Sequence, residues 1–190
     1  MSSFVQIANA VAILIGTEAR ITDPADNRTL ARTVREVWDI NRRAALRDGS
    51  WNFAARTLDL PALAGTVPGD WSAMFQLPAD AVRLLEVLTD GARDDYKLEG
   101  RVILTRAAGP LAVRVVVDVT EPALWDELFA DAFAARMAWK IGKRIAGSGY
   151  SADAGERAYR AAVTSAKSTD AREEPPIEQE ESDWITARWV

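Results

Sequence analysis

The sequence predicts an α+β fold: a helical bundle with an antiparallel β-meander inserted between the second and third long helices, plus an extended C-terminal arm. Apolar residues recur at helical spacing near both ends of the chain, over residues 2–47 and 121–168. Between them, residues 50–120 contain short β-like runs separated by glycine and proline. Strands do not alternate with helices, which argues against a parallel α/β sheet. We therefore expect one domain over residues 1–169 and an appendage over residues 170–190.

Two helices are predicted before the β insertion, over about residues 2–19 and 26–47. The first has an apolar stripe at helical spacing that begins at Phe4 and ends at Ile15. The second follows a break at Pro24, and Asp26 or Asn27 is its candidate N-cap. Six arginines make its other surfaces basic, either as a solvated face or as a surface for acidic neighbours: Arg28, Arg32, Arg35, Arg42, Arg43 and Arg47.

The β insertion is predicted to contain at least four short strands. One covers residues 82–88, and residues 96–104 form two strands that turn at Glu99 and Gly100. The clearest strand covers residues 111–119, where apolar residues at odd positions alternate with Ala112, Arg114, Val116 and Asp118. This period of two predicts a strand with one buried face.

Two more helices are predicted over about residues 121–147 and 151–168. Thr120 is the expected N-cap of the third helix. Apolar side chains cover most of its circumference, so it is either central to the core or shared with a neighbouring subunit. The fourth helix is alanine-rich and has a weak apolar stripe.

The amino-acid composition argues against enzymatic activity. The 190 residues include no cysteine and no histidine, which removes thiol nucleophiles, the commonest general base and the commonest ligands of zinc. We find no phosphate-binding loop, dinucleotide turn or nucleophile elbow. We therefore expect no enzyme activity, no metal and no cofactor. No apolar run reaches the length of a membrane span, and no basic residue precedes the first apolar run, so we expect a cytosolic product.

Charge is divided unevenly along the chain. Residues 1–169 carry 21 acidic and 21 basic residues, whereas residues 170–190 carry seven acidic and two basic residues. The domain therefore lacks the basic excess of a nucleic-acid-binding protein, and DNA would repel the arm.

Aromatic residues and turns form four segments in series. A helix containing Trp38 leads into an ALR…WNFA segment that ends at Ala54. A W…F-x-LP-x-D-x-x-R-x-L-x-V segment covers residues 71–87, a Y-x-x-EG-R-x-I-L hairpin covers residues 96–104, and an alanine-rich helix follows from Phe129. Their order and spacing resemble the head-to-tail adaptor (connector) proteins of tailed bacteriophages, of the tail tubular protein A type, over roughly residues 4–170. The core and turn residues of these motifs are Trp38, Trp51, Phe53, Trp71, Phe75, Pro78, Tyr96, Gly100 and Phe129. The sequence departs from the family at residues 134–139, where a leucine-rich stretch would be expected.

The resemblance implies a structural virion protein, made in the host cytoplasm and located in the neck between capsid and tail. It would form a homo-oligomeric ring, expected to be a dodecamer, that joins the portal protein to a downstream tail or neck protein. Genomic DNA would pass through the lumen during ejection without sequence-specific contact, and no membrane would be involved. The helical part would contact neighbouring subunits and the β part would face tail components.

The arm contains two prolines and many acids, so it is predicted to be disordered or extended when alone. Its sizeable apolar residues would dock on the portal or on a neighbouring subunit, or would fold back onto the body: Ile177, Trp184, Ile185, Trp189 and Val190. A competing interpretation is a nucleic-acid-binding regulatory module with a helix-turn-helix-like pair within residues 5–47. The long turn at Pro24 and the acidic balance argue against that alternative.

Overall fold

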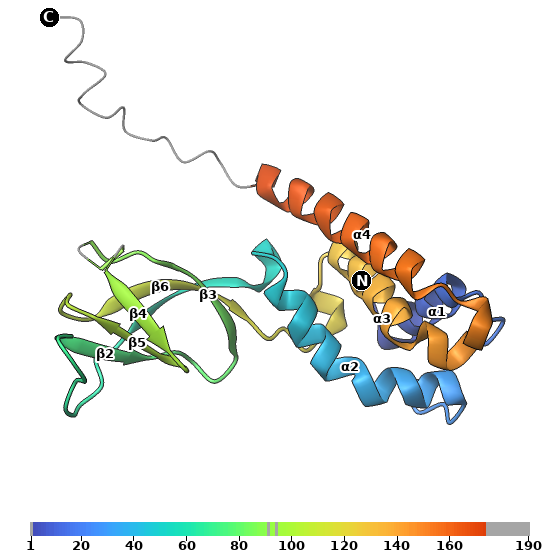
Figure 1. Cartoon of the computed structure of the whole chain (residues 1–190), viewed down its shortest axis with the longest axis horizontal. Helices are drawn as coiled ribbons and strands as arrows, with labels where there is room; N and C mark the ends of the chain where they lie inside the picture. Colours follow the sequence, from blue (N-terminus) through green and yellow to red (C-terminus); the bar gives the residue numbers. More distant parts are fainter. Residues whose placement is uncertain (1, 91, 94, 174–190) are drawn as a thin grey trace, which may run out of the picture.

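The computed structural model describes residues 2–90, 92–93 and 95–173, and it has the predicted α+β class. A helical part lies at one end of the molecule and a β part at the other, joined near the end of the second long helix (Figure 1). The long helices are α1 (Phe4–Ile15), α2 (Thr29–Arg47), α3 (Glu127–Ala146) and α4 (Ala152–Glu173). Short 3-10 helices lie at Asn52–Ala54, Pro122–Leu124 and Gly147–Gly149.

The first two helices are shorter than predicted. Helix α1 ends at Ile15, and its C-cap Gly16 has a φ of 79°, which turns the chain back so that the Thr17 N–H reaches the Ala12 carbonyl at 3.0 Å. Helix α2 begins at Thr29, with Arg28 in the N-cap position and no side-chain cap. The predicted caps Asp26 and Asn27 are therefore wrong: the Asp26 carboxylate instead accepts the Arg28 N–H at 2.9 Å, inside the preceding turn.

The later helices also differ at their ends. Helix α3 is capped by Asp126 rather than by Thr120, because Pro122–Leu124 forms a separate turn before the helix starts. The Asp126 carboxylate accepts the N–H groups of Leu128 and Phe129 at 2.9 and 3.2 Å. Helix α4 continues to Glu173, so the first residues assigned to the arm are helical. Residues 174–190 lie outside the described residues.

The β part consists of two three-stranded antiparallel sheets, in the orders β1-β6-β3 and β2-β5-β4. The strands are β1 (Ala55–Leu60), β2 (Ala73–Gln76), β3 (Ala81–Val87), β4 (Tyr96–Glu99), β5 (Val102–Thr105) and β6 (Leu111–Val117). The insertion is antiparallel, as expected, but among the described strands only β4 and β5 are neighbours both in sequence and in a sheet. Their turn lies at Gly100, with φ of 60°, and Arg101, one residue later than predicted.

Helix α3 is central to the helical core, as one of the two interpretations of its apolar surface predicted. It contacts α1, α2 and α4 of the same chain. Phe129 and Phe133 of α3 form an aromatic cluster with Trp38 and Trp125, with ring centroids 4.8 to 6.4 Å apart. The indole N–H of Trp125 donates to the Val119 carbonyl at 2.8 Å, so burial leaves this donor satisfied.

Strand β6 joins the helical core to the β core. Its residues Val113 and Val115 are buried in the core of the β part, as the alternation predicts. Val116, on the opposite face of the strand, is buried in the helical core. Just after the strand, the Asp118 carboxylate accepts two hydrogen bonds from Arg42 of α2, at 2.7 and 3.0 Å. Arg42 is only 5% exposed, so the prediction of a solvated face is wrong for this arginine; its contacts with Asp118 and Asp39 fit the alternative of acidic neighbours. Its hydrogen bond to Asp118 is the main reason that its pKa is raised.

Candidate protein-interaction surfaces

Large aliphatic side chains are exposed on the helical part. Ile13 of α1 is 78% exposed, Ile40 of α2 is 68% exposed, and Leu124 just before α3 is 66% exposed. Single exposed apolar residues are ordinary on protein surfaces. Ile13 differs because it and Leu14 border a groove of about 360 Å³ between α1, α3 and α4.

Small residues form the walls of this groove. Ala135 and Ala138 line it from α3, and Ala154, Gly155 and Ala158 line it from α4. They let the two helices approach closely. A Cβ added at Gly155 would collide with the Tyr150 hydroxyl and would also lie 3.2 Å from the Trp139 Cα, so a larger residue does not fit there without a shift. The result is an apolar concave surface with a rim of exposed aliphatic side chains.

Asp48, at the end of α2, holds α4 in place. Its carboxylate accepts hydrogen bonds from the Tyr159 hydroxyl and from Arg136 Nη1, the latter at 3.3 Å. Its backbone carbonyl accepts Lys167 Nζ at 2.8 Å. The Arg136 guanidinium also lies over the Tyr159 ring, with its central carbon 5.1 Å from the ring centroid.

The same cluster keeps Tyr159 protonated. Burial is the largest cause that raises the pKa of its hydroxyl, and the hydrogen bond to Asp48 raises this pKa further. A neutral tyrosine that donates a hydrogen bond to a carboxylate can hold a helix in place. It cannot readily act as a general base at neutral pH. We therefore interpret the cluster as a structural clamp between α2 and α4.

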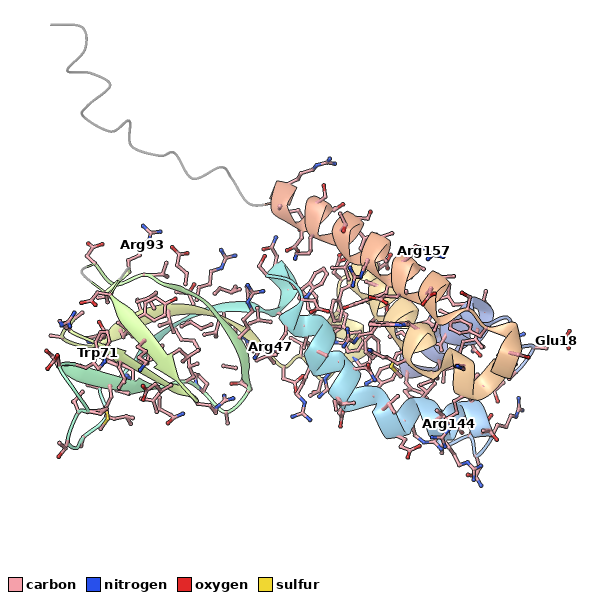
Figure 2. All side chains as sticks on the ribbon, viewed as in Figure 1. Glu18, Arg47, Trp71, Arg93, Arg144 and Arg157 are labelled. Carbon is pink, nitrogen blue, oxygen red and sulfur yellow. The ribbon has the colours of Figure 1, made fainter. Side chains whose placement is uncertain are left out.

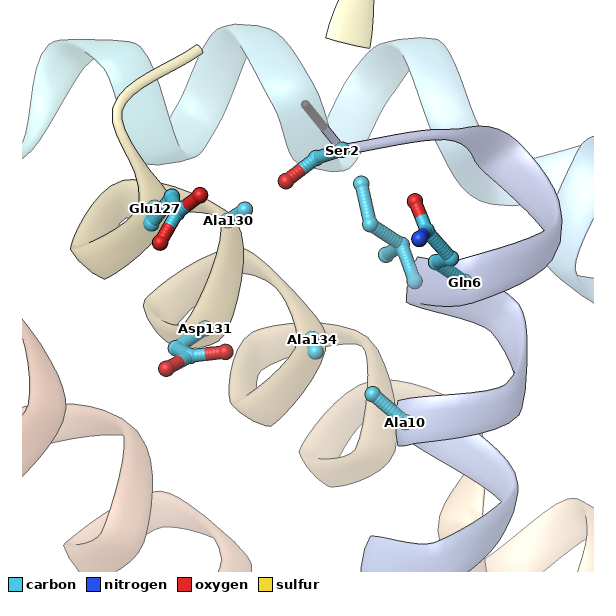
Figure 3. A pocket seen from close by; sticks show the side chains of 8 residues that line it. Ser2, Gln6, Ala10, Glu127, Ala130, Asp131 and Ala134 are labelled. Carbon is cyan, nitrogen blue, oxygen red and sulfur yellow. The ribbon is translucent and has the colours of Figure 1, made fainter. Parts of the chain in front are cut away.

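A second small groove lies between α1 and α3 (Figure 3). Glu127 and Asp131, one helical turn apart on α3, lie across it from Ser2 and Gln6. Its volume is about 210 Å³, too small for most cofactors. Within the described ranges no group of three or more histidine, cysteine, aspartate or glutamate side chains is arranged to hold a metal ion.

The motif residues do not converge on one site. Trp38, Trp51, Phe53 and Phe129 meet in or beside the helical core, where Phe129 lies 5.0 Å from Trp51 and 4.9 Å from Phe53 between ring centroids. Phe75 is buried in the β core.

The other motif residues lie at the surface or in turns of the β part. The half-buried Trp71 ring has the Arg106 guanidinium 5.0 Å from its centroid. Pro78 precedes β3 and its carbonyl accepts a hydrogen bond from Arg101. Tyr96 is exposed on the edge strand β4. The predicted docking residues of the arm, from Ile177 to Val190, lie outside the described residues.

Sequence reasoning missed the two polar links that tie the helices and strands together. Asp118 stands in the polar half of an alternating strand, and Asp48 precedes a helix-ending glycine; neither local pattern indicates a distant partner. Only their distant partners, Arg42 and Tyr159, give them a structural role.

Comparison with known proteins does not add a family: neither a scan against protein-family models nor a search of curated proteins finds a match. Among the helices that the structure describes, none combines the length and apolarity needed to cross a bilayer.

Proposed function

We propose that this chain is a structural adaptor of a tailed-phage neck, forming a ring that joins the portal to the tail and lets the genome pass. The observation that carries the proposal is the series of four motif segments, which resembles the head-to-tail adaptors in order and spacing. The two-part shape is compatible with a ring subunit whose helical part meets its neighbours and whose β part meets tail components (Figure 1).

Subunit contacts would cover the exposed apolar groups of the helical part. In a closed ring each subunit buries one surface against each neighbour, so exposed aliphatic residues become buried on assembly. The groove edged by Ile13 and Leu14 is our candidate for one side of that contact, occupied by a second copy of the chain.

The C-terminal arm would add a second attachment, to the portal or to a neighbouring subunit. Trp184 and Trp189 supply large contact areas with few rotatable bonds. Repetition around a ring would give avidity even where each contact is weak. Genomic DNA would pass without a tight grip, since residues 1–169 have balanced charge.

The direct test mixes the purified chain with portal rings from the same genome and images the product. An added ring on the portal is the expected result, and a chain that neither assembles nor attaches contradicts the proposal. Ile13→Asp should weaken ring closure, whereas Leu63→Asp, a similar change on the β part, should leave it intact.

The arm is tested by ending the chain after Glu173. Ending it after Thr169 would also remove Asp170, whose carboxylate accepts the Asn52 N–H at 3.0 Å, and would confuse docking with folding. Undiminished attachment of the chain ending at Glu173 would rule out docking by the arm. In solution, a discrete dimer that binds operator DNA would favour the regulatory alternative.

A further inference from the structure

Three arginines surround a pocket where the end of α2 meets the β part. Arg47 comes from α2, Arg83 from β3, and Arg101 from the turn between β4 and β5. Figure 2 shows Arg47 at the junction of the two parts of the molecule. The pocket has a volume of about 270 Å³, and Leu77, Leu84 and Leu98 contribute apolar surface to it.

Backbone carbonyls hold the three guanidinium groups at the pocket. Arg47 Nη1 donates to the Val82 carbonyl at 2.7 Å, Arg83 Nη1 to the Arg47 carbonyl at 3.1 Å, and Arg101 Nη2 to the Ala81 carbonyl at 3.2 Å. A carbonyl orients a guanidinium but does not neutralise its charge. The pocket lining contains no acidic residue, and within the described part of the chain no carboxylate forms an ion pair with any of the three arginines.

The pocket therefore suits a ligand that offers carboxylates beside an apolar group. Each guanidinium carries five donors in a planar fork that matches a carboxylate. Leu98 is 43% exposed, so apolar surface is available next to the charges.

The chain itself contains a segment of this chemistry. Residues 174–190 include five acidic residues against one basic residue, and three of the acids lie within four positions of Trp184. Contacts near the end of α4 place the start of this segment on the same side of the molecule as α2's end. Asp170 is hydrogen bonded to Asn52, and Asn52 lies five residues after Arg47 in the sequence. Its 17 residues span up to roughly 56 Å when extended, at about 3.3 Å per residue.

We propose that residues 174–190 of the same copy dock into the pocket formed by Arg47, Arg83 and Arg101. The same copy is favoured because exposed ion pairs are individually weak, whereas a short tether gives an effective concentration in the millimolar range. A partner that buries the tryptophans more completely displaces the segment, so docking in the free chain precedes attachment elsewhere. This inference concerns the isolated chain and does not depend on a portal.

The absence of cysteine makes a single spin label straightforward. We would introduce Ser182→Cys in the full chain, attach a nitroxide, and record paramagnetic broadening of backbone amide signals. Broadening at Leu98 and Gly100 is expected, with its loss in an Arg47→Gln, Arg83→Gln, Arg101→Gln variant. A control that removes two positive charges elsewhere, Arg32→Gln with Arg43→Gln on the exposed face of α2, should keep the broadening.

Two further samples separate the alternatives. If the triple arginine variant does not fold, Glu178→Gln, Glu180→Gln, Glu181→Gln removes the complementary charges from the segment instead, and the same loss is expected. Unlabelled isotope-enriched chain mixed with spin-labelled chain should show no broadening. Broadening in that mixture would overturn docking within one copy, and a parent chain without broadening at the pocket would overturn the site itself.

Discussion

The ion pair between Arg42 and Asp118 should contribute strongly to stability, because it joins the helical and β parts inside the protein. Replacing Asp118 with Asn keeps the size of the side chain but removes the charge that faces Arg42. Two hydrogen bonds to a charged group are affected, each contributing about 1.5–3 kcal/mol. Arg42 keeps its contact with Asp39, which offsets part of the loss. We therefore expect Asp118→Asn to lower the free energy of unfolding by about 3 kcal/mol.

Asp39→Asn is the matched control. Asp39 also pairs with Arg42, but its side chain is 68% exposed, so solvent screens the interaction. Its loss should cost less than about 1 kcal/mol. The two variants differ in which carboxylate is removed and share the same arginine.

Urea unfolding at 25 °C, followed by far-UV circular dichroism, measures both effects. With a slope of about 2 kcal/mol/M, a loss of 3 kcal/mol moves the midpoint by about 1.5 M. Equal shifts for Asp118→Asn and Asp39→Asn would refute the reasoning, since burial would then make no difference. If the helical and β parts unfolded in separate transitions in Asp118→Asn but in one transition in the parent protein, the ion pair would be shown to couple their unfolding.

Three further predictions use the same unfolding measurement. Phe129→Ala removes a buried ring from the aromatic cluster and should cost about 3–5 kcal/mol, whereas Leu128→Ala, at the preceding and exposed position, should cost far less. Asp126→Ala removes the cap of α3 and should cost about 0.5–2 kcal/mol; no loss would mean that solvent replaces the cap. In the parent protein the raised pKa keeps folded Tyr159 protonated above pH 10 while the unfolded chain loses this proton, so the free energy of unfolding falls as pH rises. Tyr159→Phe removes this titration and should make the fall shallower. An identical decline in both proteins would contradict that assignment.

The sequence predicted the fold class well where periodicity is strong. The alternation from Leu111 to Val117 identified β6, and the helical stripes identified four helices. Strand β1 was missed because residues 55–60 read Ala-Arg-Thr-Leu-Asp-Leu, with few apolar positions and only Leu60 fully buried. Strand β2 has four residues, which is too short to establish a period.

Polar residues were harder to place because their role depends on distant partners. Local spacing offered Thr120 as a cap, but the chain forms a 3-10 turn first and Asp126 takes that role. Arg42 follows the polar pattern of α2 and is nevertheless buried, since Asp118 lies 76 positions away in the sequence and meets it only after folding. Such long-range pairing has no local signal.

The end of α2 is where the parts of this molecule meet. Asp48 accepts hydrogen bonds from α4, Asn52 is bonded to Asp170 near the end of that helix, and Arg47 lines the pocket at the β part. Residues 174–190 therefore start from a helix that is anchored at the junction between the helical and β parts. Force or displacement applied to the arm would reach both parts through this junction. If the arm binds a partner as proposed, it would therefore position both parts of the chain, more directly than a segment attached to the outer tip of either part.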